Sequence, residues 1–229
     1  MLRRIAALSA VLLSAAPAAR AQDLATVCRQ IMHPSQGAWA QYRMVGGRAD
    51  GMTIKMSVVG RATRGDSTFL WLEFAARGIP IPMKDVRGDT LVVINKMLVA
   101  AYGPDLAEPR EHIMKFGSAP AMTMPPTQRS PGEAAPALHH CDDGKVVGWE
   151  RVTVAGGTFR AMHLQDSAGT GDSWVAPDLP FGVVKALSAD SGLMELTGHG
   201  MGATSQITEA PQPYDPQLFM QMLMRQGGH

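Results

Sequence analysis

Apolar and polar residues alternate along much of this chain, a pattern that predicts β-strands. The clearest example is residues 52–58, where Met52, Ile54, Met56 and Val58 alternate with polar side chains. A period of two places successive side chains on opposite faces, so this run predicts a half-buried strand. Further strands are predicted over 38–44, 69–74, 91–94 and 146–154, and in a meander of short strands within 152–204.

Helices are predicted only near the two ends of the chain and in one proline-rich segment. Asp23 is the N-cap of a short N-terminal helix, and Asp215 is the N-cap of a second helix over 217–225. Seven prolines interrupt residues 104–136, so this segment is expected to be a long connection or flap. Within it, a short helix is predicted over 109–116.

Two motifs lie within the meander. Residues 152–159 read Val-Thr-Val-Ala-Gly-Gly-Thr-Phe, and residues 174–185 read Trp-Val-Ala-Pro-Asp-Leu-Pro-Phe-Gly-Val-Val-Lys. Together with the final strand over 193–197, they resemble the LolA/LolB-like bacterial envelope proteins and related secreted domains; the resemblance is strongest over 146–204. It implies a half-open antiparallel β-barrel whose concave apolar face is covered by short helices or loops. Known members of that group carry or sense lipids or lipoproteins.

The strand pattern supports the same architecture. Strands with apolar side chains on both faces, such as 69–74, need a second layer over one face. We therefore predict a mainly β fold with a few short helices, an antiparallel half-open barrel in one domain over residues 22–208. The segment 104–136 and the two terminal helices are the predicted cover of the concave face. Residues 209–229 are a Pro- and Met-rich tail that carries the last helix.

Residues 1–21 predict a cleavable signal peptide. A basic start precedes an apolar run, and Ala19-Arg20-Ala21 marks a cleavage site before Gln22. We therefore expect a periplasmic or secreted protein, and no later apolar run is long enough to span a membrane. The signal carries three of the 21 Lys and Arg residues and none of the 20 Asp and Glu, so the mature chain is near neutral. Nucleic acid is therefore not an expected partner.

The two cysteines, Cys28 and Cys141, are expected to form a disulfide in an oxidising compartment. The alternative is metal ligation by the loop 139–143, which reads His-His-Cys-Asp-Asp. Consecutive residues of an extended chain point in opposite directions, so adjacent ligands rarely converge on one ion. We expect no metal site and no cofactor.

Methionine is the compositional outlier, with 16 residues. Its flexible, polarizable side chain suits an adaptable apolar surface, although methionine also fills protein cores and can bind Cu(I). Tryptophan suits the lining of the same kind of cavity. The predicted apolar lining of a ligand site consists of Trp39, Met52, Met56, Trp71, Met122, Met124 and Trp174.

No catalytic residues are predicted. The chain contains neither G-x-S-x-G nor H-E-x-x-H, and His163 and His199 lie at strand positions where packing roles are expected. The first hypothesis is therefore a non-enzymatic periplasmic or secreted protein that binds a lipid or lipidated protein in the concavity. The alternative is a structural or interaction module that contacts another envelope protein and has no small-molecule ligand.

Overall fold

The structure, a computed structural model, describes residues 34–78, 92–100, 111–125, 145–166, 169–189 and 192–225. The predicted signal peptide, the N-terminal helix and the loop 139–143 lie outside these residues. Cys28 and Cys141 lie outside them as well, so their disulfide stays a prediction.

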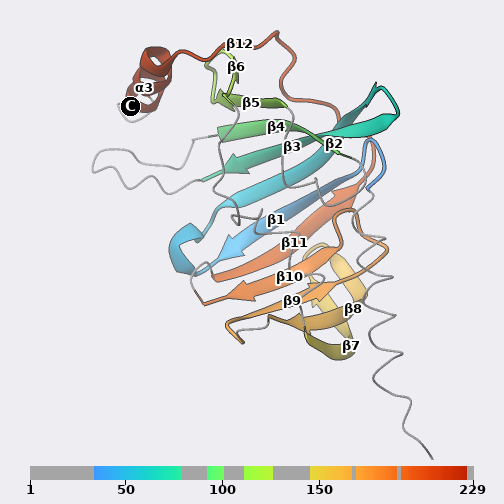
Figure 1. The fold of residues 1–229 in the computed structure, drawn as a ribbon. Helices are drawn as coiled ribbons and strands as arrows, with labels where there is room; N and C mark the ends of the chain where they lie inside the picture. The colour runs from blue at the N-terminus through green and yellow to red at the C-terminus, as the bar shows by residue number, and fades with distance from the viewer. Residues whose placement is uncertain are drawn as a thin grey trace, which may run out of the picture.

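In the described part of the chain, twelve strands form one sheet, and an α-helix follows it (Figure 1). The elements are β1 (Trp39–Val45), the short 3-10 helix η1 (Gly47–Ala49), β2 (Thr53–Arg64), β3 (Ser67–Arg77), β4 (Val92–Ala100), β5 (Glu111–Phe116), β6 (Met122–Thr123), β7 (Lys145–Val154), β8 (Gly157–Gln165), β9 (Gly171–Val175), β10 (Val183–Ser188), β11 (Gly192–Gly200), β12 (Gln212–Pro213) and α3 (Pro216–Arg225). The strand order is β12-β6-β5-β4-β3-β2-β1-β11-β10-β9-β8-β7. Neighbouring strands are antiparallel, except for β12 and β6, which run parallel.

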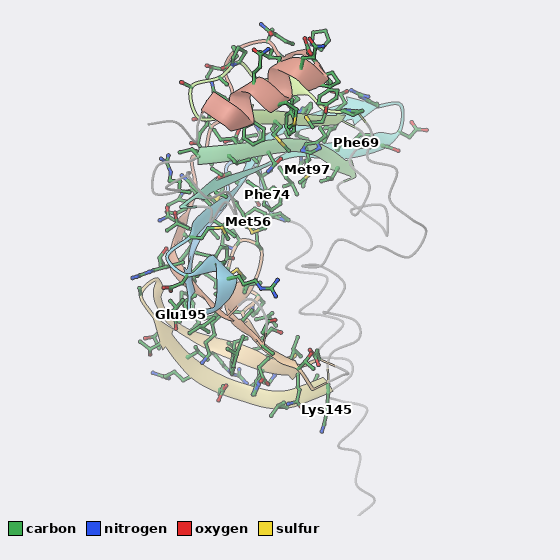
Figure 2. All side chains as sticks on the ribbon, turned by 90° about the vertical axis from the view of Figure 1, so that its left-hand side faces the viewer. Met56, Phe69, Phe74, Met97, Lys145 and Glu195 are labelled. Atoms are coloured by element: carbon green, nitrogen blue, oxygen red, sulfur yellow. The ribbon has the colours of Figure 1, made fainter. Side chains whose placement is uncertain are left out.

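The sheet is open and strongly curved. Because β1 pairs with both β2 and β11, the first half of the sheet joins the later meander at its centre. Seen from the side, the sheet forms a crescent, with Met56, Phe74 and Met97 on its concave side (Figure 2). The mainly β, half-open antiparallel architecture predicted from the strand pattern is confirmed.

The two faces of the sheet differ in chemical character. On the concave face the strand register forms three apolar rows, Ala40–Met56–Phe74, Val58–Leu72–Met97 and Tyr42–Ile54–Ala76. The alternate residues of the same strands project from the convex face, which carries Lys55, Glu73 and Lys96. One face is therefore apolar across the central strands, and the other is charged.

The main core cluster lies where the meander meets β1. Tyr42 and Leu196 are fully buried, and they belong to one cluster with Val152 and Ala161 of the β7–β8 hairpin. The tip of this hairpin reaches β11, where the Gly156 N–H donates a hydrogen bond of 2.9 Å to the Leu196 carbonyl. The hairpin thus bends one end of the sheet back toward its centre.

The loop within the Trp-to-Lys motif contributes to the same core. The Ala176 N–H donates to the Gly182 carbonyl at 2.7 Å and closes the loop between β9 and β10. Leu179 and Phe181 are buried in it, and Phe181 adopts a left-handed backbone with φ 62°. The motif therefore builds the core, because its loop delivers two apolar side chains to the main cluster.

The prediction of a helix over 109–116 is wrong, because residues Glu111–Phe116 form β5. This strand pairs with β4 along its whole length, from Val93 opposite Phe116 to Leu98 opposite Glu111. Backbone pairing with an available sheet edge outweighs the weak local helix preference of a short run. β6 then adds to β5, so the described part of the segment 104–136 extends the sheet and does not form the predicted cover.

A segment that we call the C-terminal strap, residues 201–211, crosses the convex face. Its Ile207 is buried in a cluster with Ala75, Ile94 and Ile113, which lie on that face of β3, β4 and β5. Beyond the strap, β12 pairs with β6 at the sheet edge. The strap therefore fastens the end of the chain to the back of the sheet and shields an edge that would otherwise be open to pairing.

The predicted C-terminal helix is confirmed as α3. Its N-cap is Asp215, whose carboxylate accepts hydrogen bonds from the N–H groups of Gln217 at 2.8 Å and Leu218 at 3.1 Å. Leu218 and Phe219 pack with Phe116, which lies in the same cross-strand row as the concave residue Tyr42. The chain thus passes round the sheet edge, and α3 covers one end of the concave face.

Candidate functional site

The concave face presents partly exposed apolar side chains that lie on the buried main core cluster. Met56, Phe74, Met97 and Met194 come from β2, β3, β4 and β11, and each packs against the main core cluster while remaining partly exposed. We call these four residues the concave apolar surface. Three of them are methionines, whose flexible thioethers adapt to irregular apolar shapes.

Tyr42 brings a polar hydroxyl into the main core cluster beneath this face. Its side chain is fully buried, and its hydroxyl has no hydrogen-bond partner among the described residues. Burial raises the pKa of the Tyr42 phenol well above its usual range, because the phenolate would lose its hydration. The hydroxyl is therefore a neutral, unsatisfied donor within an apolar cluster.

The structure separates the seven residues that the sequence suggested as a lining. Met56 lies on the concave face, whereas Trp39 and Trp71 alternate to the convex face of β1 and β3. Trp174 lies opposite Lys185 and, like Met56, packs against the main core cluster. The remaining three methionines are dispersed: Met52 precedes β2, Met122 is fully buried beneath α3, and Met124 follows β6.

A cation lies over each of the four tryptophans. The distances from the charged group to the ring centroid are 4.6 Å for Lys55 over Trp39, 5.3 Å for Lys96 over Trp71, 4.8 Å for Arg160 over Trp149 and 3.9 Å for Lys185 over Trp174. Cation–π contacts of this kind stabilise charged side chains on partly exposed surfaces. Each tryptophan therefore has a charged neighbour, although Trp71 and Trp174 also pack against apolar clusters.

Trp174 is the centre of the densest polar cluster. His163 stacks on its indole with 4.4 Å between ring centroids, and Glu150 accepts a hydrogen bond from the indole N–H. The His163 Nε2 lies 2.7 Å from Asp172 Oδ1, and Nδ1 lies 3.8 Å from Glu150. Because the two carboxylates sit on opposite ring nitrogens, they orient the imidazole rather than converge on one point. Among the described residues, no three His, Cys, Asp or Glu side chains form a group that could hold a metal ion.

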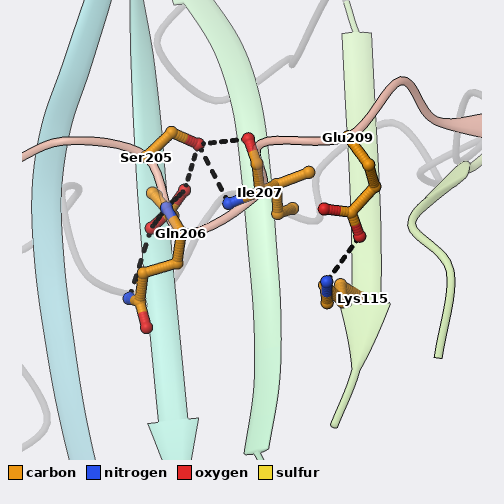
Figure 3. A network of polar contacts seen from close by, with 6 residues as sticks. Lys115, Ser205, Gln206, Ile207 and Glu209 are labelled. Atoms are coloured by element: carbon orange, nitrogen blue, oxygen red, sulfur yellow. Dashed lines mark hydrogen bonds and ion pairs between the residues drawn. The ribbon is translucent and has the colours of Figure 1, made fainter. Parts of the chain in front are cut away.

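Glu73 anchors the C-terminal strap to the convex face through Ser205 and Gln206. Figure 3 shows these two strap residues and their polar contacts. Its side chain is 1% exposed, and its carboxylate accepts hydrogen bonds from the Ser205 hydroxyl at 2.7 Å and from the Gln206 N–H at 3.0 Å. The Gln206 side-chain amide adds a third donor at 3.3 Å. Further along, Lys115 pairs with Glu209 at 2.5 Å. These contacts satisfy a buried carboxylate almost entirely from the strap.

The structure has clefts at two further places. A cleft of about 320 Å³ lies at the ends of β8, β9 and β10 and has a mixed lining that includes Leu164, Asp172 and Leu187. A second, of about 250 Å³, lies on the convex face beside the strap. Neither is lined by the methionines and tryptophans that the sequence suggested.

The residues that sequence reasoning missed are Tyr42, Phe74, Met97 and Met194. Every second residue along β2, counted from Met56, shares the face of Met56. The pairing of β2 with its neighbours extends that face to Phe74 and Met194. The alternation was visible in the sequence, but the pairing between strands was not. A consistent assignment of strand faces would have put Trp39 with Gln41 and Arg43 on the polar side.

The fold defines an open antiparallel half-barrel with an apolar concave face and a convex face that carries charged side chains of both signs. No family model and no curated protein sequence matches the chain. Among solved structures, a "putative lipoprotein" from Parabacteroides distasonis matches 74% of this chain and 98% of its own, with 10% identity and a TM-score of 0.35. A "putative exported protein with YmcC-like fold" from Bacteroides fragilis matches 73% of this chain and 97% of its own, with 14% identity and a TM-score of 0.34. Similarities this weak carry no argument about function.

No helix of the described part is sufficiently long and apolar to cross a bilayer.

Proposed function

We propose that this chain is a non-enzymatic periplasmic or secreted protein that binds an apolar ligand, a lipid or the acyl chain of a lipidated protein, on the concave face of its half-barrel. The observation that carries the proposal is the concave apolar surface itself. Met56, Phe74, Met97 and Met194 gather from four strands on one side of the sheet, and each remains partly exposed. The signal-like segment 1–21 supports export.

The contrast between the two faces supports this assignment. A sheet with one apolar and one charged face must bury the apolar one against a second layer or a ligand. α3 covers the concave face only near β5, through Leu218 and Phe219. The row that contains Met56 and Phe74 lies on strands further toward the centre of the sheet.

A fluorescent fatty-acid probe tests the proposal. We expect saturable binding to the full chain, and we expect Met56→Gln and Met97→Gln each to weaken it about tenfold, because a buried polar amide in an apolar contact costs on the order of 1–2 kcal/mol. Met201→Gln is the matched control, since Met201 is 62% exposed on the strap. Equal weakening by all three variants, or no saturable binding, would contradict the proposal.

The alternative, a structural or interaction module, predicts a concave face filled by the protein's own residues. In that case the probe does not bind, and the concave methionines affect stability alone. Deletion of residues 209–229 is not a clean test of that alternative. It removes β12 and α3, including the contact between Phe219 and Phe116, and so damages the fold itself.

A further inference from the structure

The cleft on the convex face lies where the C-terminal strap crosses the central strands. Its volume is about 250 Å³, and its lining consists of Gln41, Thr53, Lys55, Ala75, Arg77 and Gln206. The register explains this set, because Gln41, Lys55 and Ala75 are cross-strand neighbours on β1, β2 and β3, and Thr53 lies opposite Arg77. Ala75 contributes a small side chain to this lining, and Gln206 contributes a residue of the strap.

The lining carries two positive charges and no negative charge. Within the described residues, neither Lys55 nor Arg77 forms an ion pair with a carboxylate. The acid on the same face of β3 is Glu73, whose carboxylate is already occupied by Ser205 and Gln206. Two cations beside a cleft, neither of them engaged in an ion pair with a described carboxylate, form a favourable place for an anion.

The cations are held in defined surroundings. The Lys55 ammonium lies 4.6 Å from the centre of the Trp39 ring, which supports the charge on one side without neutralising it. Arg77 is exposed near the end of β3 and presents a planar guanidinium. Arg43 is a third cation nearby. It lies opposite Thr53 on β2 and opposite Glu195 on β11.

Neutral donors complete the lining. The Thr53 hydroxyl and the Gln41 side-chain amide can donate hydrogen bonds into the cleft. The Gln206 side-chain amide uses one N–H for Glu73 and has a second N–H to donate. A guanidinium binds two oxygens of a phosphate at once, and an ammonium acts as a point charge. This combination suits an oxyanion with several equivalent oxygens better than a single carboxylate.

We propose that this cleft binds a phosphate group, as a free phosphate or phosphomonoester or as the headgroup of an anionic lipid. The site is separate from the concave apolar surface and does not depend on the function proposed for it, because the two lie on opposite faces of the sheet. Arg77 and Lys55 bind the phosphate oxygens, Thr53 and Gln41 orient them, and Gln206 links the site to the strap.

Titration of the ¹⁵N-labelled full chain with inorganic phosphate, at constant ionic strength set with chloride, tests the proposal. We expect saturable shifts confined to the Thr53 amide and the side-chain amides of Gln41 and Gln206. Arg77→Gln and Lys55→Gln should each weaken binding about tenfold, the effect of losing one charge-assisted hydrogen bond. Lys96→Gln is the matched control, because Lys96 lies on the same face over Trp71 but outside the cleft.

Two further probes distinguish the sources of the phosphate. Soluble dihexanoyl phosphatidic acid and phosphatidylcholine vesicles with and without phosphatidic acid are titrated against the same variants. Vesicle binding that requires phosphatidic acid and falls with Arg77→Gln assigns a lipid headgroup, and binding of inorganic phosphate alone assigns a soluble ligand. Absence of saturable shifts with every probe overturns the proposal, and so does equal weakening by Lys96→Gln.

Discussion

Gln206 donates its backbone N–H and its side-chain amide to the buried carboxylate of Glu73, which lies 133 positions earlier in the chain. This contact joins the C-terminal strap to the third strand of the sheet (Figure 3). It satisfies a carboxylate that is 1% exposed and would otherwise be costly to bury. The strap is therefore part of the folded domain, not an appended tail.

Removal of the carboxylate should release the strap. Glu73→Ala leaves the Gln206 N–H without its acceptor and leaves the Ser205 hydroxyl with only the Ile207 carbonyl, and we expect the free energy of unfolding to fall by about 2–3 kcal/mol. Urea denaturation measures the loss. Ser205→Ala, which removes one of the three donors, should cost less, about 1 kcal/mol. Unchanged stability of Glu73→Ala would show that the Glu73 contacts make no net contribution to stability.

The helix α3 should stabilise the sheet edge through Phe219. The Phe219 ring meets Phe116 nearly edge-to-face, with 5.4 Å between centroids, and is partly buried. We expect Phe219→Ala to destabilise the protein by about 1–3 kcal/mol, less than a fully buried Phe would. Met220→Ala is the control, because Met220 is 53% exposed on the next position of the same helix. Equal effects of the two variants would argue against the docking of α3.

The ion pair between Lys115 and Glu209 should make the strap acid-sensitive. The pKa of Glu209 is lowered, chiefly because Lys115 donates a hydrogen bond to its carboxylate. A carboxyl group with a lowered folded pKa stabilises the fold above its unfolded pKa, and the contribution is lost as the pH falls through the folded value. We therefore expect wild type to exceed Glu209→Gln in stability at neutral pH and to match it in acid. A difference that persists unchanged in acid would refute this role.

Tyr42→Phe should stabilise the protein. The hydroxyl is fully buried and has no partner in the part of the chain that the structure describes, so its removal should relieve a desolvation penalty on the order of 1 kcal/mol. Because burial raises the pKa of Tyr42, the phenol ionises more readily in the unfolded chain, so wild type loses further stability as the pH rises above the unfolded pKa. Thermal unfolding of both proteins at neutral and alkaline pH should show a gap in favour of Phe that widens in alkali. A less stable Tyr42→Phe protein would show that the hydroxyl has a partner in solution.

Local patterns in the sequence predict much of this fold. The alternation from Met52 to Val58 predicts β2, and Asp215 before Pro216 predicts the start of α3. Both signals act over a few residues, through strand periodicity and helix capping. The glycine pair at 156–157 likewise marks the turn between β7 and β8.

Long-range pairing accounts for what the sequence does not reveal. The local sequence of β5 predicts a helix. The strand is stabilised by its hydrogen bonds to β4, and no local pattern predicts that pairing. The hydrogen bond between Gln206 and Glu73 could not be predicted either, because it depends on the path of the strap across the sheet. Trp39 and Trp71 were expected to line a cavity by residue type, although Gln41 and Glu73, two positions away on the same faces, indicate a polar side.

Native mass spectrometry of the protein purified from its own secreted or periplasmic fraction tests the central claim most directly. The account predicts an adduct with the mass of a lipid or an acyl chain, which organic extraction removes and which Met56→Gln and Met97→Gln reduce while Met201→Gln does not. A protein that carries no adduct, and whose concave methionines do not alter fatty-acid probe binding, would contradict the claim that the concave face is a ligand site.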